Sequence, residues 1–431
     1  MTKSSCREYG LLLPEEDHHV RGASLILIRT YQLSWLWRLH IPETRSGSQI
    51  TFPLLFSWSL LQFTTASSYF LDRSETPGEQ TANMVVNKAM VFRQIPEGLP
   101  VAGKDLTIET VVDYDASSPA PAGGVLLQAE YASFDPYMKG RMRPAHIKSN
   151  ATAFELNKPL FNQCIARVLR SNHPKYQPGD QIIGELPIQQ YVSVSGADLD
   201  KIQHLENPLG LEDVRVFLGA LGMSGLTAYS SFYEIGQPKK GETIFISAAS
   251  GSVGSMVGQL AKREGLRVIG SVGSDEKLDF IIRELGFDAG FNYKKERPAD
   301  ALKRLAPDGI DIDYENVGGE HLEAALGAMK EHGRVIVCGL ISEYNATPGQ
   351  RYPLYNYSLI LRRRLTVRGF VVFDHGFGDK YHAEHQAKVQ RWIKDGTFKV
   401  VTWECEGIDN AIDGLLALFS GRNFGKAVLK F

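Results

Sequence analysis

The segment from Phe245 to Lys262, FISAASGSVGSMVGQLAK, constrains the fold more than any other part of the chain. A β-branched run, TIFIS, leads directly into a glycine-spaced turn, and the residues after the turn have the apolar spacing of an amphipathic helix. The turn matches G-x-G-x-x-G with Ala249 in the first position, followed by Gly251 and Gly254. Such a turn is either a dinucleotide cradle or a purely structural strand-to-helix corner.

The setting of this turn favours the cradle. After Leu211, strand-like runs alternate with helical stretches, which is typical of an α/β fold with a doubly wound parallel sheet covered on both faces. In such a sheet Gly251 lets the backbone approach a pyrophosphate, and Gly254 lets the helix lie close to the strand. The six predicted strands are Thr243–Ala248, Arg267–Val272, Ala289–Tyr293, Ile310–Asn316, Arg334–Gly339 and Leu365–Val372.

The residues before Leu211 have a different pattern. Short β-like runs separated by turns predict a small, mostly antiparallel β domain. From Gly376 onward, a charged helical stretch and the run FGKAVLKF indicate that the chain returns to this first domain. We therefore expect a β domain at 84–210 that is completed by 375–431, and a dinucleotide-binding domain at 211–374.

Residues 1–83 differ from the rest and are expected to be a poorly ordered extension that ends in the linker-like SETPGEQTAN. Ser46–Leu71 carries no charge, but Thr, Ser and Gln dilute its apolar residues, so it is a weak candidate for a membrane-spanning helix. The apolar run begins far from the N-terminus and follows a charged stretch, which argues against a secretory signal.

Charge and cysteine content limit the partners. The formal net charge is −2 with both signs interspersed, which favours neither nucleic acid nor an anionic membrane as a partner. The four cysteines lie far apart, without a CxxC pair or a Cys/His cluster at zinc-finger spacing. We therefore predict no disulfide framework, no metal site and a reducing, cytoplasmic location.

The end of the second strand of the sheet indicates which dinucleotide binds. In an NAD site a carboxylate there accepts the adenosine ribose hydroxyls, but Val272 and Gly273 occupy that position. Lys277, a few residues on, supplies a positive charge for a 2′-phosphate. Asp275 and Glu276 are the evidence against this, although first-turn carboxylates also favour the helix dipole. We predict NADP(H).

Seven blocks of the sequence together resemble one family. They are GALGMSGLTAYSSFYEIG, AASGSVGSMVGQLAK, GSVGSDEK, FNYKKE, ENVGGE, VCGLISEYN and DPYMKGRM. They resemble the zinc-less medium-chain dehydrogenases/reductases of the prostaglandin reductase and alkenal double-bond reductase group, in the family's order over Met84–Phe431. The resemblance implies a GroES-like β domain, split across the two ends of the chain, around a central Rossmann domain. It also implies a homodimer formed by edge pairing of the Rossmann sheets.

The resemblance implies a reaction as well, the NADPH-dependent reduction of the carbon–carbon double bond in a small α,β-unsaturated aldehyde or ketone. Hydride addition to the β-carbon moves negative charge to the carbonyl oxygen, so an oxyanion stabiliser is required. Tyr344, in ISEYN, matches the family tyrosine near the nicotinamide ribose and is the predicted catalytic residue. Tyr137 resembles a substrate-pocket aromatic, and Met138 is expected to pack the pocket floor.

The matched blocks also imply a set of cofactor-binding residues. They fall on the pyrophosphate turn, at the 2′-phosphate and adenosine, around the nicotinamide, and in the C-terminal segment. In chain order these residues are Gly251, Ser252, Val253, Gly254, Ser255, Lys277, Tyr293, Asn316, Cys338, Gly339, Leu340, Ile341, Ser342, Tyr344, Phe370, Val371, Val372 and Asn423.

The same sequence is compatible with two other functions. A zinc-independent NADPH:quinone oxidoreductase uses the same scaffold, and the tyrosine of SEYN favours the double-bond reductase over it. From another class, the chain could be a cofactor-binding protein without significant turnover. The near-neutral charge argues against a nucleic-acid-binding version of that role.

Overall fold

The computed structural model describes residues 84–111, 114–115 and 119–431 of the chain. The predictions for residues 1–83, namely the extension and the candidate membrane segment Ser46–Leu71, lie outside the described residues. Within the described part, no helix is both long enough and apolar enough to cross a membrane.

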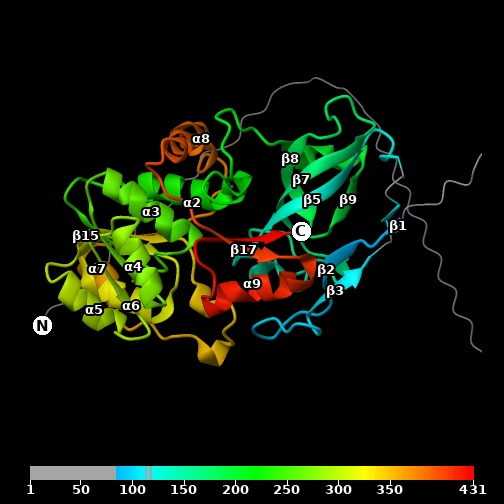
Figure 1. The fold of residues 1–431 in the computed structure, drawn as a ribbon. Coiled ribbons are helices and arrows are strands. Elements are labelled where there is room, and N and C mark those ends of the chain that lie inside the picture. The colour runs from blue at the N-terminus through cyan, green and yellow to red at the C-terminus, as the bar shows by residue number, and fades with distance from the viewer. Residues whose placement is uncertain (1–83, 112–113, 116–118) are drawn as a thin grey trace, which may run out of the picture. The chain divides into compact units, whose positions relative to one another are not determined.

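A six-stranded parallel sheet forms the α/β part of the fold (Figure 1). The strand order is β13-β12-β11-β14-β15-β16, so the chain winds outward from the centre in both directions. This confirms the predicted doubly wound sheet. The strands are β11 (Thr243–Ile246), β12 (Arg267–Val272), β13 (Ala289–Asn292), β14 (Ile310–Glu315), β15 (Met329–Val337) and β16 (Thr366–Gly369).

Several strand ends differ from the prediction by one or two residues, and the start of β15 and the end of β16 differ by more. β15 begins at Met329 rather than at Arg334, because Met329 pairs with Ile310 ahead of an irregularity in the ladder. β16 stops at Gly369, and residues 370–372 leave the sheet to line the cavity described below.

Helices cover both faces of this sheet (Figure 1). Ile244 and Ile246 of β11 pack with α2, α3, α4 and α8, whereas Phe245 packs with α5 and α6 on the opposite face, because successive strand side chains alternate in direction. The helices are α2 (Met223–Ser231), α3 (Ser252–Arg263), α4 (Asp275–Arg283), α5 (Pro298–Leu305), α6 (Gly319–Ala328), α7 (Ser358–Arg362) and α8 (Asp379–Lys394).

The second part of the fold is a mostly antiparallel β domain. Its main sheet has the order β10-β8-β7-β5-β18-β17, with β9 also paired to β5, and smaller sheets join β3-β2-β6 and β1-β4. The last strand of the chain, β18, pairs with β5, so the C-terminus completes a sheet that the first domain began. The elements are β1 (Met84–Val85), β2 (Lys88–Phe92), β3 (Leu106–Thr110), β4 (Tyr114–Asp115), β5 (Val125–Ser133), α1 (Met138–Arg141), β6 (Lys158–Pro159), β7 (Phe161–Ser171), β8 (Gln181–Pro187), β9 (Tyr191–Val194), β10 (Ile202–His204), β17 (Thr402–Glu406), α9 (Ala411–Ser420) and β18 (Lys426–Lys430).

Helix α8 packs on α2, beside the parallel sheet, before the chain returns to the β domain. The Nε2 atom of His385 lies 2.9 Å from the carbonyl oxygen of Ala220, and the Gln386 amide donates to the carbonyl of Leu221 at 2.7 Å. Burial lowers the pKa of His385 to about 4, so the imidazole is neutral at pH 7 and its Nε2–H donates to the carbonyl. The residues that join the β domain are therefore those after α8.

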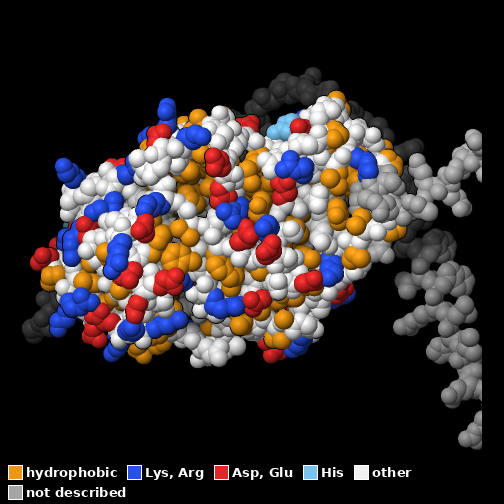
Figure 2. Space-filling model, in the orientation of Figure 1, with side chains coloured by type: hydrophobic (Ala, Val, Ile, Leu, Met, Phe, Trp, Pro, Cys, Tyr) orange, Lys and Arg blue, Asp and Glu red, His pale blue; other side chains and the backbone are white. Residues whose placement is uncertain are grey.

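Charged side chains of both signs are interspersed over the face seen in Figure 2. Lysine and arginine alternate there with aspartate and glutamate, in keeping with the net charge of −2. This face therefore lacks the basic stripe that marks a surface for a polyanion.

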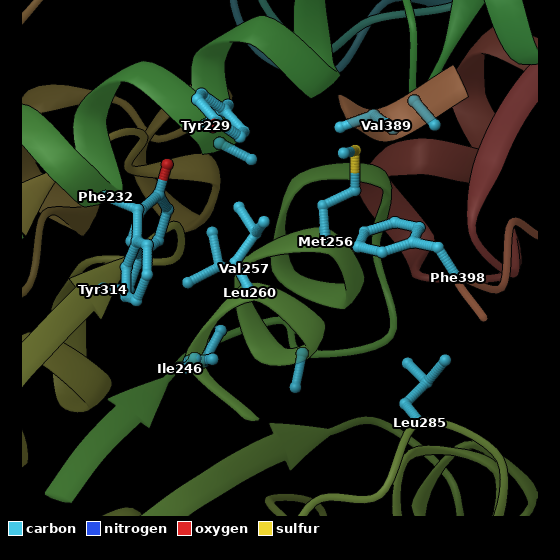
Figure 3. Close-up of a cluster of buried hydrophobic side chains, with 14 of the residues drawn as sticks. Tyr229, Phe232, Ile246, Met256, Val257, Leu260, Leu285, Tyr314, Val389 and Phe398 are labelled. Carbon is cyan, nitrogen blue, oxygen red and sulfur yellow. The ribbon is translucent and has the colours of Figure 1, made fainter. Parts of the chain in front are cut away.

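A buried cluster fixes helix α3 against the end of β11 (Figure 3). Helix α3 contributes Met256, Val257 and Leu260 to this cluster. At Gly258 a Cβ atom would lie 2.1 Å from the ring of Phe287, so only glycine allows this separation. The residues packed around the helix in Figure 3 include Tyr229, Phe232, Ile246, Leu285, Tyr314, Val389 and Phe398. This packing sets the position of the α3 N-terminus.

Candidate active site

A cavity of about 950 Å³ lies where the carboxyl ends of the parallel strands face the β domain. In open α/β sheets, ligands bind at this edge. The residues that follow the six strands and line the cavity include Gly251, Gly273, Tyr293, Asn316, Cys338 and Phe370. The β domain supplies the other wall, which includes Tyr137, Arg141, Glu185 and Lys426.

The glycine turn opens directly into this cavity. Helix α3 has Gly251 as its N-cap, and its first intrahelical bond runs from the Ser255 N–H to the Gly251 carbonyl at 3.0 Å. The N–H groups of Ser252, Val253 and Gly254 therefore have no acceptor inside the helix. At Gly254 a Cβ would lie 2.5 Å from the carbonyl oxygen of Ala248. The turn is thus a cradle of backbone donors that suits a phosphate.

Lys277 lies beside this cradle, on the first turn of α4. Its Nζ donates to the carbonyls of Gly421 and Asn423, each at 2.7 Å. Burial and the nearby charge of Lys294 lower the pKa of Lys277. An ammonium group has three hydrogens, and two of them bind the C-terminal segment. The third is available for an anion in the cavity.

Asp275 and Glu276, the carboxylates that argued for NAD, are not part of the cavity wall. Asp275 accepts hydrogen bonds from Asn292 at 2.9 Å and from Lys295. It therefore pairs with its own neighbours on the protein surface.

The loop after β14 is held by a buried carboxylate. Glu315 accepts hydrogen bonds from the Ser247 hydroxyl at 2.7 Å and from the Gly318 N–H at 2.8 Å. Burial raises the pKa of Glu315 to about 7 and raises that of its neighbour Asp313 well above the ordinary value. Asn316, which lines the cavity, donates its amide to the Ser247 carbonyl at 2.8 Å. These bonds fix the Asn316–Gly318 edge of the site.

Tyr344 places a protonated phenol in the cavity wall. Its oxygen accepts the Leu340 N–H at 3.3 Å, and burial raises the pKa of Tyr344. The hydroxyl proton has no acceptor among the described residues, so it is available to a ligand. Burial also raises the pKa of Cys338 to about 12, so the neighbouring thiol is protonated at pH 7.

Tyr137 faces the cavity from the β domain, and its hydroxyl donates to Asn162 at 2.7 Å. Met138 is fully buried and does not line the cavity. Arg141 lies near Tyr137, with its guanidinium 4.0 Å from the Phe161 ring centroid and 3.2 Å from the Glu185 carboxylate. This part of the wall is both aromatic and polar.

The structure brings most of the predicted site residues to one cavity and leaves three behind its wall. Met138, Ser255 and Leu340 do not line it. The residues that do are Gly251, Ser252, Val253, Gly254, Lys277, Tyr293, Asn316, Cys338, Gly339, Ile341, Ser342, Tyr344, Phe370, Val371, Val372, Asn423 and Tyr137.

Sequence reasoning missed several wall residues, among them Asp135, Arg141, Glu185 and Lys426. Asp135 and Arg141 lie in the block DPYMKGRM, so proximity to Tyr137 was the available signal. Glu185 and Lys426 reach the cavity only through pairing of β7 with β8 and of β18 with β5.

No group of three or more His, Cys, Asp or Glu side chains among the described residues could hold a metal ion. The hydrogen-bond donors of this wall include the Tyr344 phenol, the Lys277 ammonium, the Arg141 guanidinium and the backbone N–H groups of the turn.

The chain matches two domain families and close relatives. Residues 88–202 match the N-terminal domain of oxidoreductase, and residues 252–387 match the family described as zinc-binding dehydrogenase. An NADP-dependent oxidoreductase, RED1, of Cochliobolus heterostrophus is 49% identical over 80% of this chain and 98% of its own length. The NADP(+)-dependent 2-alkenal reductase of Nicotiana tabacum is 40% identical over 81% of this chain and 98% of its own.

A solved structure extends the comparison. CurA from Vibrio vulnificus, in complex with NADPH, has a TM-score of 0.70 and 32% identity, covering 80% of this chain and 98% of that one. The chain belongs to the medium-chain dehydrogenase/reductase family, in the group that contains these NADP-dependent reductases. The family resemblance inferred from the sequence is confirmed.

We expect Gly254→Ala to weaken dinucleotide binding by at least about ten-fold, because overpacking at the Ala248 carbonyl must displace the turn or the helix. Fluorescence titration with the coenzyme measures this change. Gly140→Ala is the matched control, since a Cβ there meets nothing within 4 Å. Unchanged affinity in Gly254→Ala would show that the turn does not hold the phosphates.

Proposed function

We propose that this protein reduces the carbon–carbon double bond of α,β-unsaturated aldehydes or ketones with NADPH. The observation that carries the proposal is the Tyr344 phenol, which lines the same cavity as the glycine cradle and keeps its proton available. The 40% identity to a 2-alkenal reductase supports the same substrate class.

The cofactor is NADP(H), and the cavity fits it. The α3 N–H groups at Ser252, Val253 and Gly254 suit the pyrophosphate, and the Lys277 ammonium suits the 2′-phosphate. The wall from Asn316 and Cys338 to Phe370 is left for the nicotinamide half. When bound, NADPH supplies a hydride for the β-carbon of the substrate.

In this proposal Tyr344 stabilises the negative charge that the reduction creates on the carbonyl oxygen of the substrate. Hydride addition at the β-carbon leaves an enolate, whose oxygen needs a hydrogen-bond donor. The raised pKa of Tyr344 keeps the phenol protonated at pH 7, so it donates to that oxygen. The Leu340 N–H holds the phenol oxygen from behind, which orients the donor.

The substrate lies against the β-domain wall in this proposal. Tyr137 binds it directly, while Met138 supports the wall from behind. Other aromatic side chains that line the cavity, from both domains, include Phe134, Tyr352, Phe370, Phe373 and Phe419, which suit an apolar enal or enone.

We also propose a homodimer in the cytoplasm, with no nucleic-acid or membrane partner. Strand β16 is one of the two edges of the parallel sheet, and all four of its residues are exposed. Val367 on β16 is 40% exposed, and Leu361 on the preceding helix α7 is 82% exposed. An exposed edge strand leaves backbone N–H and C=O groups unpaired, which favours pairing with a second copy.

The proposed reaction is tested by NADPH consumption against a panel of enals, enones and quinones, with the products identified by mass. We expect saturated carbonyl products from the enals and enones. Tyr344→Phe should lower kcat for them by at least about ten-fold while the NADPH affinity is kept. Tyr176→Phe is the control, because the Tyr176 hydroxyl donates to the Ile202 carbonyl inside the β domain. Turnover of quinones alone would establish the quinone oxidoreductase instead, and no turnover would leave a binding protein.

Lys277→Ala should weaken NADPH binding by about ten- to hundred-fold, because a charge-assisted bond to the 2′-phosphate is lost. The same variant should weaken NADH binding only slightly. That smaller loss reports the effect of removing the hydrogen bonds from Lys277 to Gly421 and Asn423. Lys262→Ala, which breaks an ion pair with Asp288, is the control. Equal losses for both coenzymes would refute the assignment.

Val367→Lys should convert the dimer to a monomer, since a lysine on an edge strand opposes strand pairing. Sedimentation velocity of the wild type and the variant measures the change. Val86→Lys places the same charge at a valine that is 53% exposed in the β domain, and it should leave the dimer intact. A dimer that persists in Val367→Lys rules out the β16 edge as the interface.

A further inference from the structure

A chain of buried polar groups lies behind Tyr137 and joins it to the C-terminal strand. Lys426 on β18 is 3% exposed, Asp135 is 5% exposed and Asn162 on β7 is 1% exposed. The Lys426 ammonium donates to the Asp135 carboxylate at 2.5 Å and to the Phe134 carbonyl at 3.1 Å. Buried charges need such partners, so this ion pair is a built feature of the site.

The ion pair determines which way the Asn162 amide faces. The Asn162 Nδ2 donates to the Ser133 carbonyl at 2.9 Å and to the second carboxylate oxygen of Asp135 at 3.1 Å. Both of those groups only accept hydrogen bonds, and an asparagine amide has its donor on one side and its acceptor on the other. The amide oxygen of Asn162 must therefore face away from them, toward Tyr137.

This orientation fixes the hydrogen bond of the phenol. The Tyr137 hydroxyl lies 2.7 Å from the Asn162 amide oxygen and must donate its single proton to it. Burial and the charge of Asp135 raise the pKa of Tyr137, so the proton is present at pH 7. The phenol oxygen then offers only its lone pairs to the cavity, in contrast to Tyr344, whose proton is available.

We propose that Asn162, oriented by the Lys426–Asp135 ion pair, is a positioning residue that holds the Tyr137 phenol as a hydrogen-bond acceptor in the substrate wall. Asn162 does not line the cavity and acts only through Tyr137. This role rests on the proposed function, because Tyr137 is assigned there to the substrate.

The same chain connects the substrate wall to the cofactor turn. Gly425, the neighbour of Lys426, donates its N–H to the Ser250 carbonyl at 3.0 Å and pairs with Gly251. The stem of Lys426 packs against Gly219, where a Cβ would lie 3.1 Å from it. The position of Tyr137 is therefore set relative to the glycine turn.

A double-mutant cycle of Asn162→Leu and Tyr137→Phe tests the proposal. Leucine keeps the side-chain volume of Asn162 but cannot accept a hydrogen bond. With an enal as substrate, we expect Asn162→Leu to lower kcat/KM about three- to ten-fold alone, and less than about two-fold in the Tyr137→Phe background. The NADPH affinity should be unchanged in all four proteins.

Asn87→Leu is the matched control. Asn87 is a buried asparagine of the same domain that bonds to the backbone of Tyr191 at 3.0 and 3.1 Å, away from the cavity. It should lower the melting temperature and leave kcat/KM unchanged. An equal loss of kcat/KM from Asn162→Leu in both backgrounds would overturn the proposal, because Asn162 would then act through packing alone.

Two further measurements separate this proposal from the proposed reaction. If the wild type reduces quinones but no enal, the reaction is wrong, and the cycle is run with the quinone. Crystal structures of the wild type and of Asn162→Leu test the proposal without any turnover. The Tyr137 side chain should change its rotamer in the variant. A Tyr137 ring that does not move would refute the positioning role of Asn162. If Asn162→Leu does not fold, Asn162→Ser replaces it, since serine is polar but too short to reach Tyr137.

Discussion

The close approach of α3 to the end of β11 is the constraint on which the rest of the site depends. Gly254 leaves no room for a Cβ beside the Ala248 carbonyl, and Gly258 leaves none beside Phe287. Because the helix lies so close, the N–H groups of its first turn converge on one point of the cavity. Gly425 pairs with Gly251 at that turn, so the β domain takes its position from the same place.

Two features of the cavity wall determine how it accommodates negative charge: its neutral hydrogen-bond donors and its buried ion pair. Burial keeps Tyr344 and Cys338 protonated, while the one buried ammonium described at the wall, Lys426, is bound to Asp135. The two phenols differ because their partners differ. Tyr344 accepts a backbone N–H and retains its proton, whereas Tyr137 gives its proton to Asn162. Hydrogen-bond polarity, rather than residue type, distinguishes their chemistry.

Much of the fold could be predicted because it depends on local pattern. The six strands of the sheet were found from β-branched runs and helical spacing, and the errors were at strand ends, where Met329 pairs across an irregularity. The site was less accessible. Met138, Ser255 and Leu340 share motifs with wall residues but do not line the cavity, because which residues of a motif reach a cavity depends on backbone geometry that sequence spacing does not record.

The sequence by itself determined the α/β fold, the glycine cradle and the family, since each is written in residues adjacent along the chain. Only the tertiary structure decided that Lys277 binds the C-terminal segment and that Lys426, Asp135 and Asn162 stand in line behind Tyr137. Those contacts join residues that lie far apart in the sequence. These contacts are strong because the groups are buried and lie within hydrogen-bond distance of each other. Burial and short distance both arise only after the β domain has closed on its last strand.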